Sequence, residues 1–531
     1  MNDSRVLPAG LSVTEITAAD IFTSDLSKPM PPAAKAALQV VRGDAPDDEL
    51  AGTEAALAAE FSVAFGDSLR FDFRRRLWMR CDHGAWHEDR TAGALRQLQS
   101  WAETRVFEQV ARAVSKRDMV ATAAAAKRAL SARALRNVLD LAAAQIAMAD
   151  DGKGWDPDPW LIVTRDGTAV DLRTGEARTA TPADRVTLTL GVTYDAGATC
   201  PTFLRFLRDV CDDDPALVDL VHKAAGYSLS GDTREQKFFI CFGNGANGKS
   251  TLLEALAFVM GDLAAVIPFS VLMRDRDTRS VPVEIAQLPG RRFVRASELR
   301  AGSPIDEGRI KAMTGGDVLK ARGLYQMPFE FRPIAKMWLA CNSLPRVDDR
   351  TFSFWRRAIA IPFTRTFEGA SCDPQLSHKL QAEWSGILNW MVKGALAWQR
   401  EGLPQAEAAR AVTQDWRESQ DMIGQWASTC LVTHVDGRLK AADAYRRFGA
   451  WAEAEALTER ERPGRRTFGE WMAQHFTRKS TASGKVYLAR LVDGEGSDAL
   501  TGNPLTRAQG EDLPGTLNTL NYPHLKASIR V

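Results

Sequence analysis

One short motif constrains this chain more than any other feature of its sequence. Residues 243–250 read GNGANGKS, which matches the pattern G-x-x-x-x-G-K-[ST] at every fixed position. The motif follows an apolar run over 237–242 and precedes a helix-like segment over 251–260. Glycines let such a loop turn its backbone N–H groups onto phosphates, and the start of the next helix adds a positive dipole end. The sequence therefore predicts a strand, a phosphate-binding loop and a helix in that order.

The motif also indicates which residues would hold a nucleotide. Lys249 would reach the terminal phosphates, and the hydroxyl of Ser250 would be offered to Mg²⁺. We therefore expect ATP and Mg²⁺ as cofactors. A chance glycine-rich turn is the alternative, and the strand pattern before the motif and the helix pattern after it disfavour that reading. The expected nucleotide contacts are Gly243, Asn244, Gly245, Ala246, Asn247, Gly248, Lys249, Ser250 and Thr251.

Length and composition set outer limits on the protein. The 531 residues are too many for one ordinary core, because domains typically hold about 100–200 residues. No apolar stretch approaches the roughly 18 residues of a membrane span, and the first residues lack the layout of a secretory signal. The seven cysteines are scattered singly, which fits a reducing compartment. Cys81, His83 and His87 are residue types that can bind a metal. Because no second cysteine pair accompanies them, a solvated hairpin loop is a better interpretation than a zinc site. We expect a cytoplasmic protein with no membrane partner.

Charge is segregated along the chain although the total is only +1. Between Arg291 and Arg357 there are 14 Lys and Arg against 7 Asp and Glu, a balance of +7. Between Arg438 and Arg490 there are 12 against 6, a balance of +6, so the rest of the chain carries −12. A polyanion should therefore be bound locally, in these two segments. The alternative, arginines on solvated helices that balance distant acids, is weaker for the first segment because its basic residues fall among strand-like runs.

Periodicity changes several times before the motif. The first residues are rich in Ala, Pro, Asp and Ser without a sustained period, which is typical of a flexible leader. Short strand patterns over 69–73 and 77–80 are followed by Ala- and Leu-rich helix patterns. A hairpin pattern over 160–172 and helix patterns near 201–211 and 215–229 then lead to the phosphate loop. We expect a small α+β domain ahead of the core.

After the motif, strands and helices alternate to about residue 363, as in an α/β nucleotide-binding core. Trp384, Trp390 and Trp398 follow at a spacing that favours helix packing over a base-stacking surface. The fold class we expect is α/β, a P-loop NTPase with an N-terminal α+β domain and a C-terminal helical and winged-helix module. The expected ranges are 1–58 for a leader, 59–232 for the α+β domain, 233–365 for the core, 366–429 for a helical segment, 430–491 for the winged-helix-like module and 492–531 for a tail.

Two further strand patterns end in polar residues that suit phosphate chemistry. The run 292–298 ends in Glu298, from where a carboxylate could organise Mg²⁺ or polarise the attacking water. Leu299 follows, so the usual pair of acids is missing and both duties stay open for Glu298. The run 336–342 ends in Asn342, whose amide could hold the hydrolytic water or the γ-phosphate beside the acid. A lone Glu at a strand end could equally be a surface residue.

Arg356 and Arg357 stand at the start of another apolar run, 355–363. A guanidinium delivered to a neighbouring subunit's γ-phosphate is worth about 10³–10⁵ in rate. Such a role implies a ring of subunits, with either arginine as the finger. The alternative is that the two arginines pair with Asp348 and Asp349, which is plausible for one of them and less so for both.

Between the acid and the amide, residues 310–331 predict a basic hairpin. Two extended runs flank a turn over 323–326, and the hairpin carries Lys320, Arg322 and Tyr325. Positive charge beside an aromatic ring suits a single-stranded nucleic-acid backbone whose bases can stack. With Lys311, which precedes the turn, these residues are the expected DNA contacts.

Taken together, these segments resemble one family. GNGANGKST, the ASE strand end, KAMTGGDVLKARGLY, LACNSLP and FWRRAIAIPF, in that order, resemble the superfamily 3 helicase core of phage, satellite and plasmid primase–helicases and of the related poxvirus nucleoside triphosphatases. The preceding segment, with PTFLRFLRDV and AAGYSLSG, looks like the domain before that core. The likeness spans roughly residues 60–490 and implies an AAA+-like fold for the core.

The resemblance implies a hexameric ring that is driven by ATP and moves 3′ to 5′ on a DNA strand. It assigns Lys249 and Ser250 to phosphates and Mg²⁺, Glu298 to the acidic motif, Asn342 to sensing the nucleotide, and Arg356 or Arg357 to the finger in trans. Lys320 and Arg322 would face DNA in the pore. Partners would be single-stranded and forked DNA, other copies of the chain, and a separate primase or other replication proteins.

Many relatives carry a primase whose metal site needs Asp-x-Asp on a strand. Here Asp156 and Asp158 lie in a Pro- and Trp-rich loop, so we expect no primer synthesis. The expected function is replication of a phage, prophage, satellite or plasmid in a bacterial or phage-infected cytoplasm. One alternative is an origin-binding initiator or loader in which the basic module at 430–490 reads duplex DNA. Another is a defence ATPase that assembles without unwinding DNA.

Overall fold

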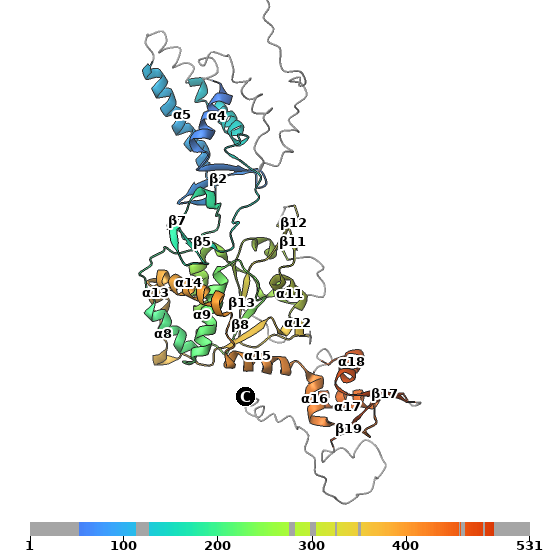
Figure 1. Cartoon of the computed structure of the whole chain (residues 1–531). Helices are drawn as coiled ribbons and strands as arrows, with labels where there is room; N and C mark the ends of the chain where they lie inside the picture. Colours follow the sequence, from blue (N-terminus) through green and yellow to red (C-terminus); the bar gives the residue numbers. More distant parts are fainter. Residues whose placement is uncertain are drawn as a thin grey trace, which may run out of the picture. The chain divides into compact units, whose positions relative to one another are not determined.

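The computed structural model describes residues 53–112, 127–274, 282–297, 304–323, 327–348, 352–455, 457, 462–481 and 484–492. Its contacts divide the chain into two compact units. The first contains residues up to 81 together with 87–153, and the second contains 82–86 and the chain from 154 onward. The strand β3 (Ala85–Glu88) falls on this division. Helices and several sheets make up a mixed α/β fold (Figure 1).

The first unit packs helices against short strands. Its elements are α4 (Glu54–Phe65), β1 (Leu69–Asp72), β2 (Leu77–Asp82), α5 (Gly93–Arg112), α7 (Ala132–Ala143) and β4 (Ala149–Asp150). β1 pairs antiparallel with β2 and parallel with β4, which confirms the two predicted strands. The Thr53 hydroxyl caps α4 by accepting from the backbone N–H of Ala56, so residues 54–58 are helical rather than part of a leader. Residues 1–52 of the expected leader and 493–531 of the expected tail lie outside the described residues.

The second unit begins with the predicted hairpin and helix pair. These elements are β5 (Leu161–Val163), β6 (Thr168–Asp171), β7 (Ala177–Thr179), η1 (Pro182–Asp184), α8 (Pro201–Val210) and α9 (Pro215–Leu229). A proline opens both helices at a position where its missing N–H costs nothing. Asp214 caps α9 through the backbone N–H groups of Ala216 and Leu217. The hairpin and both helices confirm the sequence predictions.

A parallel sheet of five strands forms the centre of the second unit. Its order is β14-β8-β13-β10-β9, and every neighbouring pair is parallel. The strands are β8 (Phe238–Phe242), β9 (Ala264–Val266), β10 (Phe293–Ser297), β13 (Lys336–Cys341) and β14 (Ala358–Pro362). Short 3₁₀ turns connect parts of this region: η2 (Gly261–Leu263), η3 (Phe269–Leu272) and η4 (Val283–Gln287).

Both faces of this sheet are covered, as the continuous apolar composition of the strands requires. Side chains of β8 alternate between two cores, with Phe239 and Cys241 in one and Phe238 and Ile240 in the other. The first core is closed by α8, α9, α10 (Lys249–Met260) and α14 (Trp384–Glu401), and the second by α11 (Glu307–Gly315) and α12 (Phe352–Trp355). Figure 1 shows α9 and α14 on one side of β8 and β13, with α11 and α12 on the other.

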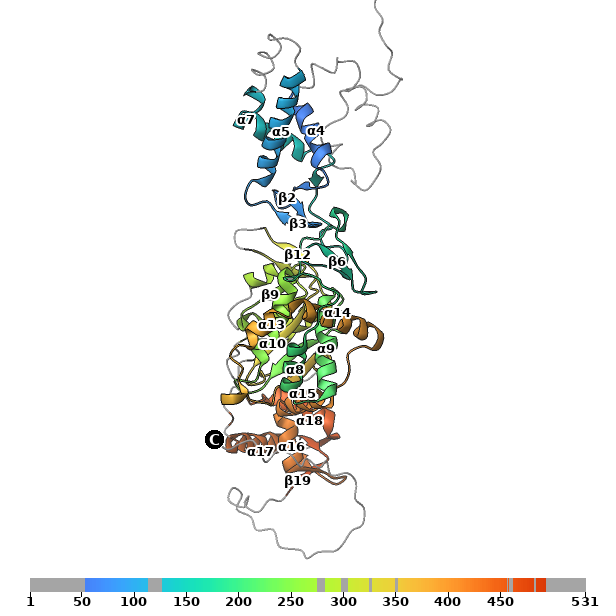
Figure 2. The same ribbon diagram turned by 90° about the vertical axis from the view of Figure 1, so that its left-hand side faces the viewer.

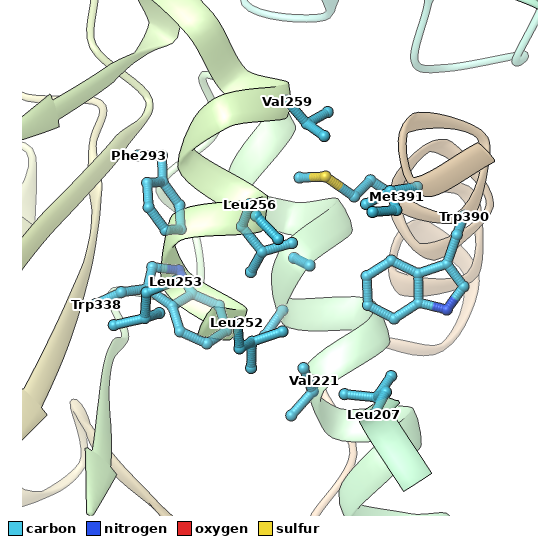
Figure 3. Close-up of a cluster of buried hydrophobic side chains, with 14 of the residues drawn as sticks. Leu207, Val221, Leu252, Leu253, Leu256, Val259, Phe293, Trp338, Trp390 and Met391 are labelled. Carbon is cyan, nitrogen blue, oxygen red and sulfur yellow. The ribbon is translucent and has the colours of Figure 1, made fainter. Parts of the chain in front are cut away.

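The helix after the phosphate loop is anchored in the first of these cores. Figure 3 shows Leu252, Leu253, Leu256 and Val259 of α10 between the sheet residues and the helices beyond. These four side chains are at most 2% exposed. Removing one buried leucine typically costs about 2–5 kcal/mol, so the packing of this face fixes where α10 begins. The helix start carries Lys249 and Ser250.

The three tryptophans of α14 pack as the sequence predicts. Trp398 is 2% exposed and Trp390 is 8% exposed, and both join the first core. Trp384 stacks on Phe258 of α10. The elements before and after α14 are η5 (Gly369–Ser371), α13 (Leu376–Gln381) and α15 (Glu407–Ser419). No helix in the described part of the chain has the length and apolar character that crossing a membrane requires.

Two smaller features complete the second unit. β11 (Leu319–Ala321) and β12 (Phe329–Phe331) pair antiparallel, which is the predicted basic hairpin. Toward the C-terminus a separate core holds helices and short strands together (Figure 2). Its elements are α16 (Met422–Cys430), β15 (Leu431–Thr433), β16 (Leu439–Lys440), α17 (Ala441–Ala454), α18 (Arg465–His475), β17 (Arg478–Thr481), β18 (Gly484–Tyr487) and β19 (Ala489–Leu491). Two helices followed by a hairpin are the element order expected for residues 430–491.

The domain ranges predicted from the sequence stay a prediction. In the structure, the hairpin strands and α8 and α9 share their hydrophobic core with α10 and the parallel sheet.

Candidate nucleotide-binding site

The loop between β8 and α10 needs glycine at its two fixed positions. Gly248 has φ +84°, in the left-handed region, and a Cβ built there would lie 2.6 Å from Cγ1 of Val210. A Cβ on Gly243 would lie 2.2 Å from the carbonyl oxygen of Phe363. Gly245, at a variable position of the motif, has nothing within 4 Å of its Cβ. Contacts inside the protein are therefore enough to require glycine at the two fixed positions.

Lys249 lies inside the loop that precedes it. Its Nζ donates to the carbonyl oxygens of Gly243 at 2.6 Å and Asn244 at 3.1 Å, and to Oδ1 of Asn247 at 2.9 Å. Oδ1 of Asn342, at 3.3 Å, is a fourth acceptor around these three N–H groups. Burial lowers the pKa of Lys249 from its ordinary value because the ammonium loses hydration. All four acceptors are neutral oxygens, and within the described residues this cation has no carboxylate partner.

The thiol of Cys341, which lies near Lys249, is not a counter-charge for the lysine. Burial raises the pKa of Cys341 to about 12, so this thiol is neutral at physiological pH. Asn247 is 3% exposed, and its Nδ2 donates to the carbonyl oxygen of Phe363 at 3.2 Å, which turns Oδ1 toward the lysine. A buried ammonium that is held by neutral oxygens and lacks an anion is well suited to take an anionic ligand.

The sheet order places this lysine where α/β proteins bind ligands. Phe242 pairs with Cys341 and with Pro362, so the loop leaves the carboxyl edge of β8 between the ends of its two neighbours. The chain runs from β8 to β9 at one side of the sheet and later returns to β14 at the other. Such a reversal of strand order opens a crevice at the carboxyl ends of the strands. Asn342 follows β13 at this edge and is exposed.

ATP and Mg²⁺ fit the donors that the described residues present. The side chain of Ser250 is exposed at the first turn of α10, and Thr251 beside it is half-buried. The helix starts at the loop, so its first backbone N–H groups and its positive dipole end point to the same place as Lys249. Glu298, expected as the acidic residue, follows β10 in the sequence and lies outside the described residues.

Arg356 and Arg357 lie at the opposite edge of the sheet from the phosphate loop. They fill the turn between α12 and β14, and the carbonyl of Arg357 accepts from the N–H of Phe238 at the start of β8. Five strand residues separate this edge from the loop, about 16 Å at ~3.3 Å per residue. Neither arginine can therefore reach the phosphate loop of its own chain.

The predicted alternative for these arginines, pairing with Asp348 and Asp349, is not observed for Asp348. That carboxylate accepts from Arg274 at 2.8 Å and from Arg346 at 3.0 Å. Asp349 lies outside the described residues. Arg357 is 8% exposed and Arg356 is half-buried, and both donate to the side chain of Gln236.

The basic hairpin presents some of the expected DNA contacts. Lys320 on β11 is 78% exposed, and its Nζ lies 3.4 Å from Oε1 of Glu330 across the hairpin. Such an exposed pair is worth at most about 1 kcal/mol, so it leaves the ammonium available. Arg322 is exposed and Lys311 on α11 is half-buried. Tyr325, in the turn, lies outside the described residues.

Sequence reasoning missed two residues beside the arginines. Gln236 precedes β8 with φ +55° and accepts from both arginines, and Thr314 near the end of α11 accepts from Nε of Arg357 at 3.2 Å. Gln236 stands in no quoted motif, and Thr314 lies in the segment KAMTGGDVLKARGLY without any signal that marks it. Only the approach of α11 and the start of β8 to the α12–β14 turn identifies them.

Comparisons with known proteins agree with the family resemblance. A family model described as "D5 N terminal like" matches residues 57–212, and a model described as a family of unknown function, DUF5906, matches residues 241–357. "Putative helicase L207/L206" of Acanthamoeba polyphaga mimivirus is 29% identical over 321 residues, which are 56% of this chain and 33% of that protein. "Putative helicase 022R" of Frog virus 3 is 25% identical over 272 residues, 48% of this chain and 28% of that protein.

A third relative carries a different name. "Putative primase C962R" of African swine fever virus is 29% identical over 126 residues, 23% of this chain and 13% of that protein. The matches therefore span a third or less of each of these relatives. A solved structure of the NrS-1 C terminal region aligns over 83% of this chain and 99% of that chain, at 11% identity and a TM-score of 0.46. That likeness is too low to support a conclusion about this chain.

Proposed function

We propose, from the premise that this chain is related to the phage and viral primase–helicases of superfamily 3, that it is an ATP-driven DNA helicase of replication. One observation carries the proposal: the ammonium of Lys249 lies at the carboxyl edge of a parallel sheet, held by neutral oxygens and without an anionic partner among the described residues. A polyphosphate is the ligand that completes such a site.

The chain's own groups would divide the work at the nucleotide. Lys249 would exchange its bonds to neutral oxygens for bonds to the β- and γ-phosphates. Ser250 and Glu298 would hold Mg²⁺, which when bound supplies charge neutralisation at the phosphates. The contact between Asn342 and Lys249 supports a role for the Asn342 amide, which would orient a water or the γ-phosphate and sense which nucleotide is present. Glu298 would serve as metal ligand or as the residue that activates the water.

Hydrolysis would need a second copy of the chain. Arg356 and Arg357 lie about 16 Å along β8 from the phosphate loop of their own chain. Their guanidinium groups could therefore act only on the nucleotide of a neighbouring copy. A head-to-tail contact of this kind repeats around a closed ring. We propose a homo-hexamer, in which each interface joins the loop of one copy to the arginines of the next.

DNA would pass the basic hairpin, with Lys311, Lys320, Arg322 and Tyr325 as contacts. Opening a base pair costs about 1.4 kcal/mol on average, so a hairpin that shifts with each hydrolysis could move the strand in steps. We propose 3′ to 5′ movement on single-stranded DNA, as in the family that the chain resembles.

We propose no primer synthesis by this chain, because the candidate acids Asp156 and Asp158 are engaged in other contacts. Oδ1 of Asp156 accepts from the backbone N–H of Thr187 at 2.7 Å, and Oδ1 of Asp158 lies 2.7 Å from Nη2 of Arg173.

Two substitutions test the proposed helicase. Lys249→Ala should abolish both ATP hydrolysis and unwinding, whereas Lys320→Ala should lower only the stimulation of hydrolysis by DNA. The assay measures ATP turnover with and without single-stranded DNA, and strand displacement on forks with 3′ or 5′ tails. ATP turnover by the wild-type chain without strand displacement would instead support an ATPase that assembles without unwinding. Equal loss of basal hydrolysis in the Lys320 variant would refute the DNA-contact assignment.

A second function, duplex binding by the C-terminal module, is favoured by its charge. Residues 462–481 and 484–492 hold seven Lys and Arg and a single Glu. The side chains of Arg478, Lys479 and Lys485 on the β17–β18 hairpin are exposed, and none makes a salt bridge to a described carboxylate. An initiator that binds an origin would use such a surface. Gel shifts with random duplex and with duplex from DNA that carries the gene test this function, and equal, weak binding to both would argue against it.

A further inference from the structure

The two neighbouring arginines have different environments although they adjoin in the sequence. All three nitrogens of the Arg357 guanidinium donate within the chain: Nε to Oγ1 of Thr314, Nη2 to Oε1 of Gln236 at 3.4 Å, and Nη1 to the carbonyl of Ser353. Its side chain is buried, at 8% exposed. Moving this guanidinium to another molecule would break three hydrogen bonds, one of them to the buried hydroxyl of Thr314.

Arg356 is held far more lightly. Its Nη2 donates to the same Oε1 of Gln236, and within the described residues no bond is recorded for its Nε or Nη1. Arg356 is half-buried as a residue, whereas Arg357 is buried. The two cations also repel, since the charge of Arg356 contributes to a lowered pKa of Arg357 after the larger effect of burial. An anion from another molecule beside Arg356 would relieve this repulsion.

Arg357 also connects the α12–β14 turn to α11, the helix that precedes the basic hairpin of β11 and β12. Thr314, 3% exposed, accepts from Arg357 Nε at 3.2 Å and donates through its hydroxyl to the carbonyl of Ile310 at 2.7 Å. A Cβ built on Gly315 would lie 3.8 Å from Nη2 of Arg357, so the guanidinium also lies against the end of α11. Gly316 then turns the chain with φ +77° into β11, which carries Lys320.

We propose that Arg356 is the arginine that contacts the nucleotide of a neighbouring copy. Three positioning residues would link it to the basic hairpin: Gln236, Arg357 and Thr314. The inference rests on the proposed function and deepens it, because it separates the roles of the two arginines. A displacement of the hairpin by DNA would pass through α11 and Arg357 to the α12–β14 turn and so to Arg356. Hydrolysis would then respond to DNA through these contacts.

A mixed assembly tests the role of Arg356. Chains with Lys249→Ala and chains with Arg356→Ala are co-expressed with different affinity tags and purified through both tags, so that every assembly contains both. Lys249→Ala alone should show no ATP hydrolysis, and Arg356→Ala alone should hydrolyse ATP about 10³-fold more slowly than wild type. In an equal mixture, half of the copies have an intact loop and the other half have an intact arginine, so about one interface in four joins the two. The mixture should therefore recover about a quarter of the wild-type rate. A mixture no faster than the two variants alone, or an Arg356→Ala chain with wild-type turnover, would overturn the assignment.

A matched pair of substitutions tests the link through Thr314. Thr314→Val removes the hydroxyl while keeping the shape, and Thr314→Ser keeps the hydroxyl. The valine variant should lower the ratio of DNA-stimulated to basal hydrolysis by about tenfold, the loss expected for one hydrogen bond to a charged group, while the KM for ATP stays near the wild-type value. The serine variant should retain the ratio. A wild-type ratio in the valine variant, or equal loss in both variants, would overturn the positioning role.

The wild-type chain separates failure of this inference from failure of the proposed function. If it hydrolyses ATP and responds to DNA while the variants behave like wild type, only the roles given to Arg356 and Thr314 are wrong. If the wild-type chain does not hydrolyse ATP, the proposed helicase itself is wrong.

Discussion

Two alanine substitutions in one loop should have very different effects. Gly248 and Gly245 both belong to the phosphate loop, yet their surroundings differ. A Cβ at position 248 would lie 2.6 Å from Val210 and 3.0 Å from the ring of Phe206, on a backbone with φ +84°. A Cβ at position 245 would meet nothing within 4 Å, and φ there lies outside the left-handed region. Gly245→Ala is therefore a matched control for Gly248→Ala.

The expected cost of Gly248→Ala follows from these contacts. A residue with a Cβ in the left-handed region costs about 1–2 kcal/mol, and an extra carbon in a packed core costs about 1–3 kcal/mol more. The sum, about 2–5 kcal/mol, must appear as weaker nucleotide binding, as lower stability, or as both. Expressed wholly as affinity, it corresponds to a loss between about 30-fold and a few thousand-fold. The Gly245 variant should change the affinity by less than about threefold, equal to about 0.7 kcal/mol.

Calorimetric titration with a non-hydrolysable ATP analogue and Mg²⁺ measures the affinity, and thermal unfolding of the free protein measures the stability. The two losses for Gly248→Ala should together account for the cost. If both variants bind and unfold like wild type, or if Gly245→Ala is the more damaging, the structural reason given for the glycine at 248 is wrong.

Three further outcomes are expected. Burial lowers the pKa of His222 below its ordinary value of 6.5, so the unfolded chain binds the proton first as the pH falls. The free energy of unfolding should therefore decrease as the pH drops below 6.5. His222→Gln should flatten this dependence, measured by urea unfolding at several pH values. Gly226→Ala should destabilise the protein by about 1–3 kcal/mol or more, because its Cβ would lie 2.0 Å from a backbone nitrogen of α14. Gly449→Ala is the control: its Cβ would meet nothing within 4 Å, so it should be neutral or stabilise by up to about 1 kcal/mol in the same urea assay. Changing both Arg478 and Lys479 to Ala should weaken duplex binding. It should also reduce the slope of log affinity against log salt concentration by about 0.9 for each lost phosphate contact. An unchanged slope would exclude these two side chains from the DNA interface.

Local patterns in the sequence were sufficient for much of the fold. The apolar run before the phosphate loop becomes β8 (Phe238–Phe242), and the following pattern becomes α10, because strand alternation, buried runs and helix periods act over a few residues. The prolines at 201 and 215 open α8 and α9, and the turn signal near 323 gives the hairpin of β11 and β12. The position of Lys249 at the start of α10 also follows from its motif, and the role of its ammonium at a phosphate stays a prediction.

The sequence alone determined that a phosphate loop, a basic hairpin and two arginines occur in this order on an α/β chain. Only the tertiary structure decided which of them lie at the same edge of the sheet. The parallel pairing of β8 with β13 brings Asn342 to Lys249, and the pairing of β8 with β14 holds Arg356 and Arg357 at the far edge beside Gln236 and Thr314. These contacts join residues about 40 to 120 positions apart, and no short-range pattern records them because they depend on strand order and on buried packing between helices and sheet.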